Sequence, residues 1–181
     1  MAANQTASLA FLNTFAAPAA AILSWLAIET LFSGKPTALG WSSGMLAGLV
    51  AITPAAGFVE PLYAILMGLI AGVICFMGVL MRSKIGYDDS LDVLGIHGIG
   101  GVTGAILTGL FCTVNGKGYI AGNPEQVIWQ VKAVAVTIAY AVVCSLVIGL
   151  VIKYTIGLRV DDTAENAGLD QTQHGERAYN Q

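Results

Sequence analysis

Apolar residues gather in long runs along this 181-residue chain, and short polar stretches separate the runs. Each run approaches or exceeds the roughly 20 residues that an α-helix needs to cross the hydrocarbon core of a bilayer. The pattern therefore predicts an all-α fold, a polytopic membrane helix bundle with about five transmembrane helices. The predicted spans are residues 9–32, 38–59, 62–81, 93–114 and 127–156.

The composition agrees with a chain that lies in lipid. Hydrophobic residues make up 56% of the chain and charged residues 10%, whereas a soluble domain carries roughly 25% charged residues. The formal charge of -3 is small and the cations are scattered, so the sequence does not indicate nucleic-acid binding. We expect a transmembrane bundle over residues 1–157 and a hydrophilic tail over residues 158–181.

The distribution of lysine and arginine predicts the orientation of the chain. An odd number of spans places the two chain ends on opposite sides of the membrane, and positive residues concentrate on the cytoplasmic side. Lys117 and Lys132 fall on one side of the predicted spans. The other side carries Lys35, Arg82, Lys84, Lys153, Arg159 and Arg177. We therefore expect a cytoplasmic C-terminus.

Glycines repeat at four-residue spacing in three of the predicted spans. The pairs are Gly44 with Gly48, Gly68 with Gly72, and Gly100 with Gly104. In lipid such pairs let helix backbones approach closely, because association there depends on van der Waals packing. The pairs predict a compact bundle and carry no function by themselves.

His97 is the titratable residue that most needs an explanation, because it lies within a predicted span. A titratable group inside a membrane normally faces a cavity or a partner. Glycines flank it in the otherwise apolar segment Val93–Gly101. A neutral imidazole offers one donor and one acceptor, which suits a pore for a small polar molecule. Position alone leaves a second interpretation equally open, in which His97 joins two helices by a hydrogen bond.

Other acidic residues have ordinary structural interpretations. Asp92 begins the helix that carries His97, where the helix dipole favours a carboxylate, so we expect it to cap the helix mouth. Asp88 and Asp89 fit a solvated loop. Glu29 lies near the end of its span, where we expect it to reach lipid headgroups.

The sequence does not predict an enzyme, a cofactor or a metal. It holds no Ser-His-Asp order, metal-ligand cluster or phosphate-binding glycine loop. An intramembrane enzyme that used His97 with Asp92 is disfavoured, because five residues on one α-helix separate them by about 140°.

Ordered motifs along almost the whole chain resemble the ammonium transporter family, which includes bacterial channels, yeast permeases and, more distantly, the Rhesus proteins. They are Gly34–Pro36, Ala47–Gly57, Asp88–Gly98, Gly157–Val160 and Gly168–Asp170. The resemblance implies transport of ammonium or ammonia, with methylammonium as an analogue, across the plasma membrane. It also implies a homotrimer in which each subunit has its own hydrophobic pore.

The same resemblance implies roles for individual residues. His97 matches the second of two histidines that are hydrogen-bonded to each other at mid-membrane in the family. Val93, Leu46 and Thr53 match positions that line or border the pore.

In the tail, Gly157 ends the last predicted span and is expected to act as a hinge, since glycine adopts backbone angles closed to other residues. Thr172 matches a position that is phosphorylated in plant relatives. The tail as a whole matches the cytoplasmic segment that regulates the channel and helps to dock a PII-type signalling protein.

This sequence departs from the family pattern in one respect. Full-length members have about eleven spans, and this chain resembles the C-terminal five, without the helices that carry the first histidine. The chain is therefore expected to be a fragment, or a half-subunit that a separate N-terminal half completes. The alternative function is a membrane-anchored ammonium-sensing or regulatory module that displays a PII-binding tail.

Overall fold

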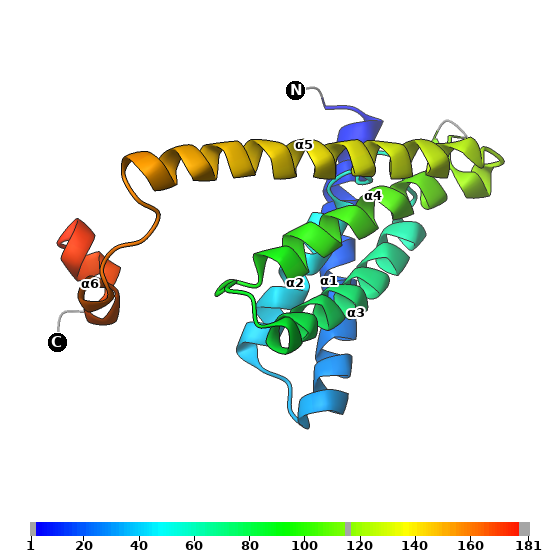
Figure 1. Cartoon of the computed structure of the whole chain (residues 1–181). Coiled ribbons are helices and arrows are strands. Elements are labelled where there is room, and N and C mark those ends of the chain that lie inside the picture. Colours follow the sequence, from blue (N-terminus) through cyan, green and yellow to red (C-terminus); the bar gives the residue numbers. More distant parts are fainter. Residues whose placement is uncertain (1–2, 115–116, 178–181) are drawn as a thin grey trace. The chain divides into compact units, whose positions relative to one another are not determined.

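The computed structural model describes residues 3–114 and 117–177, and all regular structure within these ranges is helical (Figure 1). The chain folds as two compact units, residues 1–135 and 136–181. The helices are α1 (Gln5–Ser33), α2 (Ala38–Ile52), α3 (Pro61–Ile85), the π-helix η1 (Leu94–Gly98), α4 (Ile99–Phe111), the 3-10 helix η3 (Tyr119–Ala121), α5 (Glu125–Thr155), α6 (Asp162–Ala167) and the π-helix η4 (Asp170–His174).

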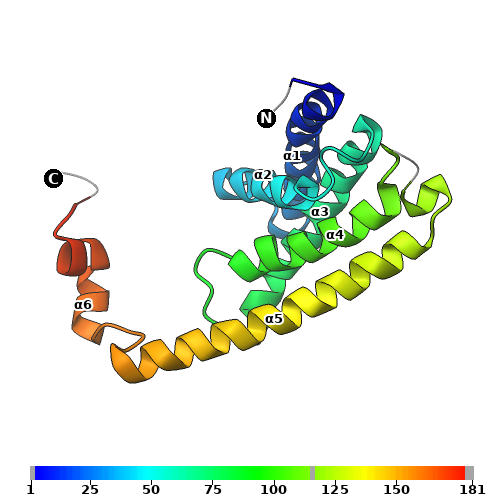
Figure 2. The same ribbon diagram turned by 90° about the horizontal axis from the view of Figure 1, so that it is seen from above.

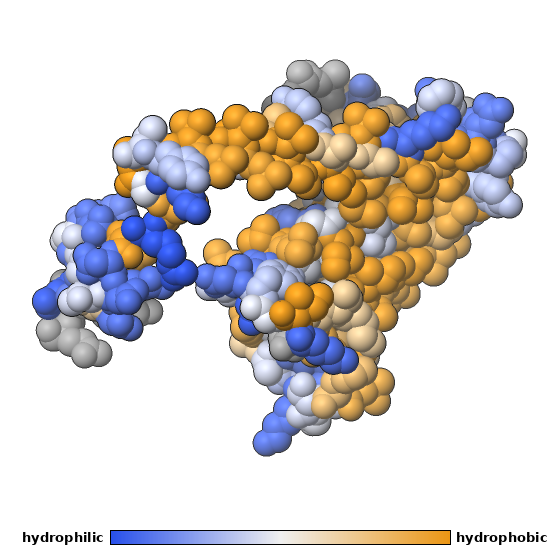
Figure 3. Space-filling model, viewed as in Figure 1, coloured by the Kyte–Doolittle hydropathy of each residue, from blue (hydrophilic) through white to orange (hydrophobic). Residues whose placement is uncertain are grey.

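Among the described residues, four helical segments are long and apolar enough to cross a membrane. They are Gln5–Ser33, Pro61–Arg82, Leu94–Phe111 and Glu125–Thr155. These segments agree with four of the five predicted spans. Figure 3 shows apolar side chains over the long helices and hydrophilic ones over the tail.

The predicted span 38–59 forms a helix that is shorter than expected. Its α-helix, α2, has 15 residues, which cover about 22 Å of a hydrocarbon core that is about 30 Å thick. The cause is Pro54, which has no N–H to donate and whose ring clashes with the carbonyl one turn earlier. Residues 53–58 continue as turns, so the chain still extends beyond the helix without regular α geometry.

Asn13 of α1 supports this irregular segment. Its side chain is fully buried, and its Nδ2 donates to the carbonyl oxygens of Ala56 and Val59, each at 2.8 Å. A backbone carbonyl in lipid has no water to bond, so irregular backbone persists only where the protein supplies partners. Asn13 therefore supplies hydrogen bonds to backbone carbonyls that are no longer part of a helix once Pro54 has ended α2.

Helices α1 to α4 pack together in the first unit (Figure 2). Their close contacts depend on the predicted glycine pairs. A Cβ atom at Gly68 would collide with the backbone of Ala17 in α1, and one at Gly104 would collide with the backbone of Ala51 in α2. Gly44, Gly48, Gly72 and Gly100 are similarly crowded by neighbouring elements. The pairs thus permit the backbone approach that the sequence predicted.

A buried apolar cluster joins η1 to the neighbouring helices. Trp25, Ala47, Cys75, Phe76 and Ile96 pack together, and the rings of Trp25 and Phe76 meet edge to face with centroids 5.4 Å apart. Ile96 anchors η1 in this cluster. The residue after it, His97, is left on the exposed side.

Replacing Asn13 by Leu should lower the free energy of unfolding by about 2 kcal/mol, because one buried and one part-buried carbonyl would lose their donor. Thermal unfolding of the purified protein in detergent micelles measures the loss. Thr14→Ala is the matched control, since the neighbouring Thr14 hydroxyl donates only to Ala10 within α1 among the bonds described. Equal stability of Asn13→Leu and Thr14→Ala would show that Asn13 does not support the segment.

Candidate pore-lining site

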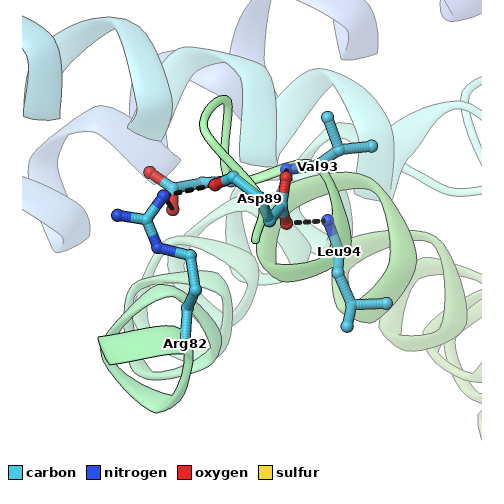
Figure 4. Close-up of polar contacts among 5 residues, drawn as sticks. Arg82, Asp89, Val93 and Leu94 are labelled. Atoms are coloured by element: carbon cyan, nitrogen blue, oxygen red, sulfur yellow. Dashed lines mark hydrogen bonds and ion pairs between the residues drawn. The ribbon is translucent and has the colours of Figure 1, made fainter. Parts of the chain in front are cut away.

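The loop that follows α3 leads directly into the helix of His97. Gly86 ends α3 with a left-handed backbone, at φ 77. The Asp89 carboxylate then accepts hydrogen bonds from the backbone N–H groups of Val93 and Leu94, both at 2.9 Å (Figure 4). Asp89 therefore caps the helix, whereas the sequence suggested only a solvated loop for it.

Arg82, near the end of α3, joins the same loop (Figure 4). Its Nη1 lies 3.0 Å from Oδ1 of Asp92 and also donates to the backbone carbonyl of Asp89. Asp92 has φ 54, the one positive φ of a non-glycine residue in the part of the chain that the structure describes. The capping expected of Asp92 is thus performed by Asp89, and Asp92 instead pairs with an arginine from the preceding helix.

His97 lies in the π-helical turn η1. The N–H of Ile99 donates to the carbonyl of Leu94, five residues earlier, which is the bond that defines this geometry. Cys75 in α3 contacts the same turn, with its Sγ 3.8 Å from the carbonyl oxygen of Ile96. Short π-helical turns within α-helices are often found at functional sites.

The four residues that the sequence assigned to a pore are all exposed in this chain. The exposed fractions are 49% for Val93 and 40% for Leu46, and His97 and Thr53 are also exposed. Within residues 3–114 and 117–177, the imidazole of His97 forms no hydrogen bond or ion pair. Both interpretations of His97, the pore residue and the link between two helices, therefore stay predictions.

Two helices carry these residues. Leu46 and Thr53 are seven residues apart in and just after α2, so they share one face, and the Thr53 hydroxyl donates back to the carbonyl of Leu49 at 2.7 Å. Val93 and His97 lie along the start of η1, which contacts α2. A hollow of about 350 Å³ opens beside the loop and is lined by Tyr87, Asp88, Asp89, Val93, Leu94 and Gly98.

Glu29 is a buried residue whose role the sequence did not indicate. It is 9% exposed, and its carboxylate accepts hydrogen bonds from the Thr37 hydroxyl at 2.8 Å and the Thr37 N–H at 3.2 Å. Thr37 in turn caps α2 by accepting from the N–H of Gly40. The expectation that Glu29 reaches lipid headgroups is wrong, because the carboxylate instead fixes the start of the helix that carries Leu46.

The tail is ordered by local hydrogen bonds. Gly157 has φ 85 and donates its N–H to the carbonyl of Ile152, so it has the conformation expected of a glycine that ends the last span. Asp161 caps α6, and the hydroxyl of Thr172 donates to the carbonyl of Gly168 at 3.0 Å. Among the described tail residues, α6 and η4 bury no side chain.

Some residues of this site were not identified from the sequence, and they differ in whether the sequence carries a signal for their role. Asp89 precedes an apolar helix by a few residues, which is a recognisable capping signal. Arg82 and Cys75 gave no such signal, because their contacts depend on how α3 lies against η1.

Known proteins resemble this chain over nearly its whole length. It is 49% identical to the ammonium transporter of Aquifex aeolicus, over 99% of this chain and 43% of that protein. Its fold matches Mep2 of Saccharomyces cerevisiae with a TM-score of 0.84 and 33% identity, over 89% of this chain and 39% of that one. A Sensor Amt Protein gives a TM-score of 0.83 at 26% identity, over 94% and 43%.

The chain spans less than half the length of these relatives. The long apolar helices of its described residues are those of a multi-pass membrane protein. The model of the Ammonium Transporter Family matches residues 1–179, and the chain therefore belongs to that family.

Proposed function

We propose that this chain supplies one wall of a histidine-lined pore that conducts ammonium or ammonia across the plasma membrane. The observation that supports this most strongly is His97, which is exposed and without a polar partner among the described residues. A lone imidazole in lipid is costly, so a partner or a passing substrate is expected to face it.

The surroundings of His97 suit a small amine better than a hydrated cation. Val93 and Leu46 offer exposed apolar side chains, and a dry apolar passage opposes ions because their hydration shell is lost there. A neutral imidazole can still donate or accept one hydrogen bond. Ammonium would then pass a proton to water before the passage, and the ammonia that crosses would take a proton from water beyond it.

A second half is needed to complete this pore. The chain covers less than half the length of its relatives, and Leu46, Thr53, Val93 and His97 face outward from it. We infer that an N-terminal half, joined to this chain or separate from it, supplies the opposite wall and a second histidine. The completed subunit would assemble as a homotrimer.

The tail is proposed to lie in the cytoplasm and to regulate the pore through a PII-type signalling protein. The excess of Lys and Arg on that side supports the orientation. The short helices α6 and η4 bury no side chains of their own, so a partner surface would supply most of their packing.

Sensing is the second candidate function. The likeness to a Sensor Amt Protein favours it, and the ordered tail would carry the signal. Uptake of labelled methylammonium separates the candidates, because a purely sensing chain would bind substrate without net transport.

His97→Ala should change the selectivity for ammonium over potassium by about tenfold, the worth of one hydrogen bond. The test protein is a chimera in which this chain replaces the matching segment of the Aquifex aeolicus transporter. Flux into liposomes is measured at equal protein content. His174→Ala, which removes the one other histidine of this chain, is the control. Wild-type selectivity in His97→Ala would contradict the proposed pore.

The chain alone, reconstituted in liposomes, should conduct little ammonium, because one wall of the pore would open to lipid. Stopped-flow measurement of internal pH after an ammonium pulse tests this. Saturable uptake that His97→Ala abolishes would show instead that the chain forms a complete pore by itself.

Gly157→Asp should lower methylammonium uptake by the chimera, since a charge at the base of the tail would disturb its docking. Gly157→Asn is the control, because asparagine has nearly the same shape as aspartate without the charge. It also tolerates the positive φ found here. Thr172→Asp should act in the same direction, with Thr172→Ser retaining the hydroxyl that bonds to Gly168. Unchanged uptake in both aspartate variants would mean that the tail does not gate transport.

A further inference from the structure

An ion pair and several hydrogen bonds hold the loop that leads into η1. A guanidinium from α3, the carboxylate of Asp92 and the backbone carbonyl of Asp89 converge on one point (Figure 4). The Asp89 side chain meanwhile faces the other way and binds the first two N–H groups of the helix. The loop is therefore fixed to α3 on one side and to the helix start on the other.

Backbone strain accompanies these contacts. Asp92 has φ 54, a left-handed conformation that residues with a Cβ atom adopt only rarely and that aspartate and asparagine tolerate best. Such a residue persists only where its surroundings fix it, and strained residues often lie at functional sites. Two contacts hold it here, the ion pair with Arg82 and the hydrogen bond from the Asp92 N–H to the carbonyl of Asp89 at 3.2 Å.

The strained residue directly precedes the π-helical turn. The carbonyl of Asp92 accepts from the N–H of Ile96 at 2.9 Å, and Leu94 accepts from Ile99 five residues on. Rotation of Asp92 out of its left-handed conformation would redirect that carbonyl and shift the first hydrogen bonds of η1. His97 follows Ile96, so its imidazole would turn with them.

We propose that Arg82 and Asp92 act as a positioning pair, which sets the register of η1 and thereby the direction of the His97 side chain. The proposal rests on the pore function proposed for His97. In this role Arg82 and Asp92 touch no substrate and act only through the backbone of residues 92–97.

An ion pair that only stabilised the fold would give a different result when it is removed. Its loss would reduce the amount of folded protein and lower ammonium and potassium fluxes in the same proportion. A positioning pair changes the ratio of the two fluxes at equal protein content, because the imidazole no longer meets the substrate in the same geometry. Selectivity is therefore the readout that separates the two.

The variants are Arg82→Gln, Asp92→Asn and both together, in the chimera described above. Asparagine tolerates a positive φ as well as aspartate does, so Asp92→Asn removes the charge and leaves the backbone preference. Arg82→Lys keeps a cation that can pair with Asp92 and should restore selectivity. Lys84→Gln and Asp88→Asn are the controls, since each removes an exposed charge from the same region.

Each single variant should change the ratio of ammonium to potassium flux by about threefold to fivefold, as expected for a partly exposed pair. The double variant should change it no further, because the two residues form one contact. Amide hydrogen exchange of residues 89–98 should rise in the same variants and remain unchanged in the controls.

Unchanged selectivity in Arg82→Gln and Asp92→Asn, with an active unsubstituted chimera, would overturn the positioning pair and leave the proposed pore intact. Additive effects in the double variant would also overturn it. An unsubstituted chimera that conducts no ammonium would contradict the proposed function itself, so the two failures are distinguishable.

Discussion

Backbone N–H and C=O groups inside a bilayer must find partners within the protein, because the hydrocarbon core offers no water. The irregular segments of this chain are possible only because side chains from neighbouring helices meet that requirement. Asn13 binds the carbonyls that follow α2, and Asp89 binds the N–H groups that begin η1. Both irregular segments adjoin residues assigned to the pore, Thr53 and Val93. The regular helices thus form the frame, and the departures from regular geometry place the candidate pore residues.

Much of the frame could be predicted from the sequence. Runs of apolar residues predicted the long helices, and paired glycines predicted where helix backbones approach each other, as at Gly68 and Gly104. The family followed from ordered motifs such as Asp88–Gly98, and the family match confirms it. These features are visible because each depends on residues close together in the chain.

Contacts between distant residues could not be predicted in the same way. The role of Glu29 depends on a loop that returns Thr37 to it, and Arg82 reaches Asp92 only because α3 packs beside η1. The π-helical turn also left no sequence signal, since its glycines fit an α-helix equally well. The residues assigned to the pore stay predictions, and their exposure on one chain that spans less than half of its relatives is consistent with a missing wall.

The proposed pore requires that His97 meets the substrate as a neutral imidazole. Solid-state NMR of the chimera with ¹⁵N-labelled histidine tests it directly, with the His97 signals identified by their absence from the His97→Ala variant. His97 in such a pore should give the two unequal ¹⁵N signals of a neutral imidazole, which shift when ammonium is added and do not shift with the same concentration of potassium. Signals of a protonated imidazole, or signals that do not shift when ammonium is added, would contradict the proposed role of His97.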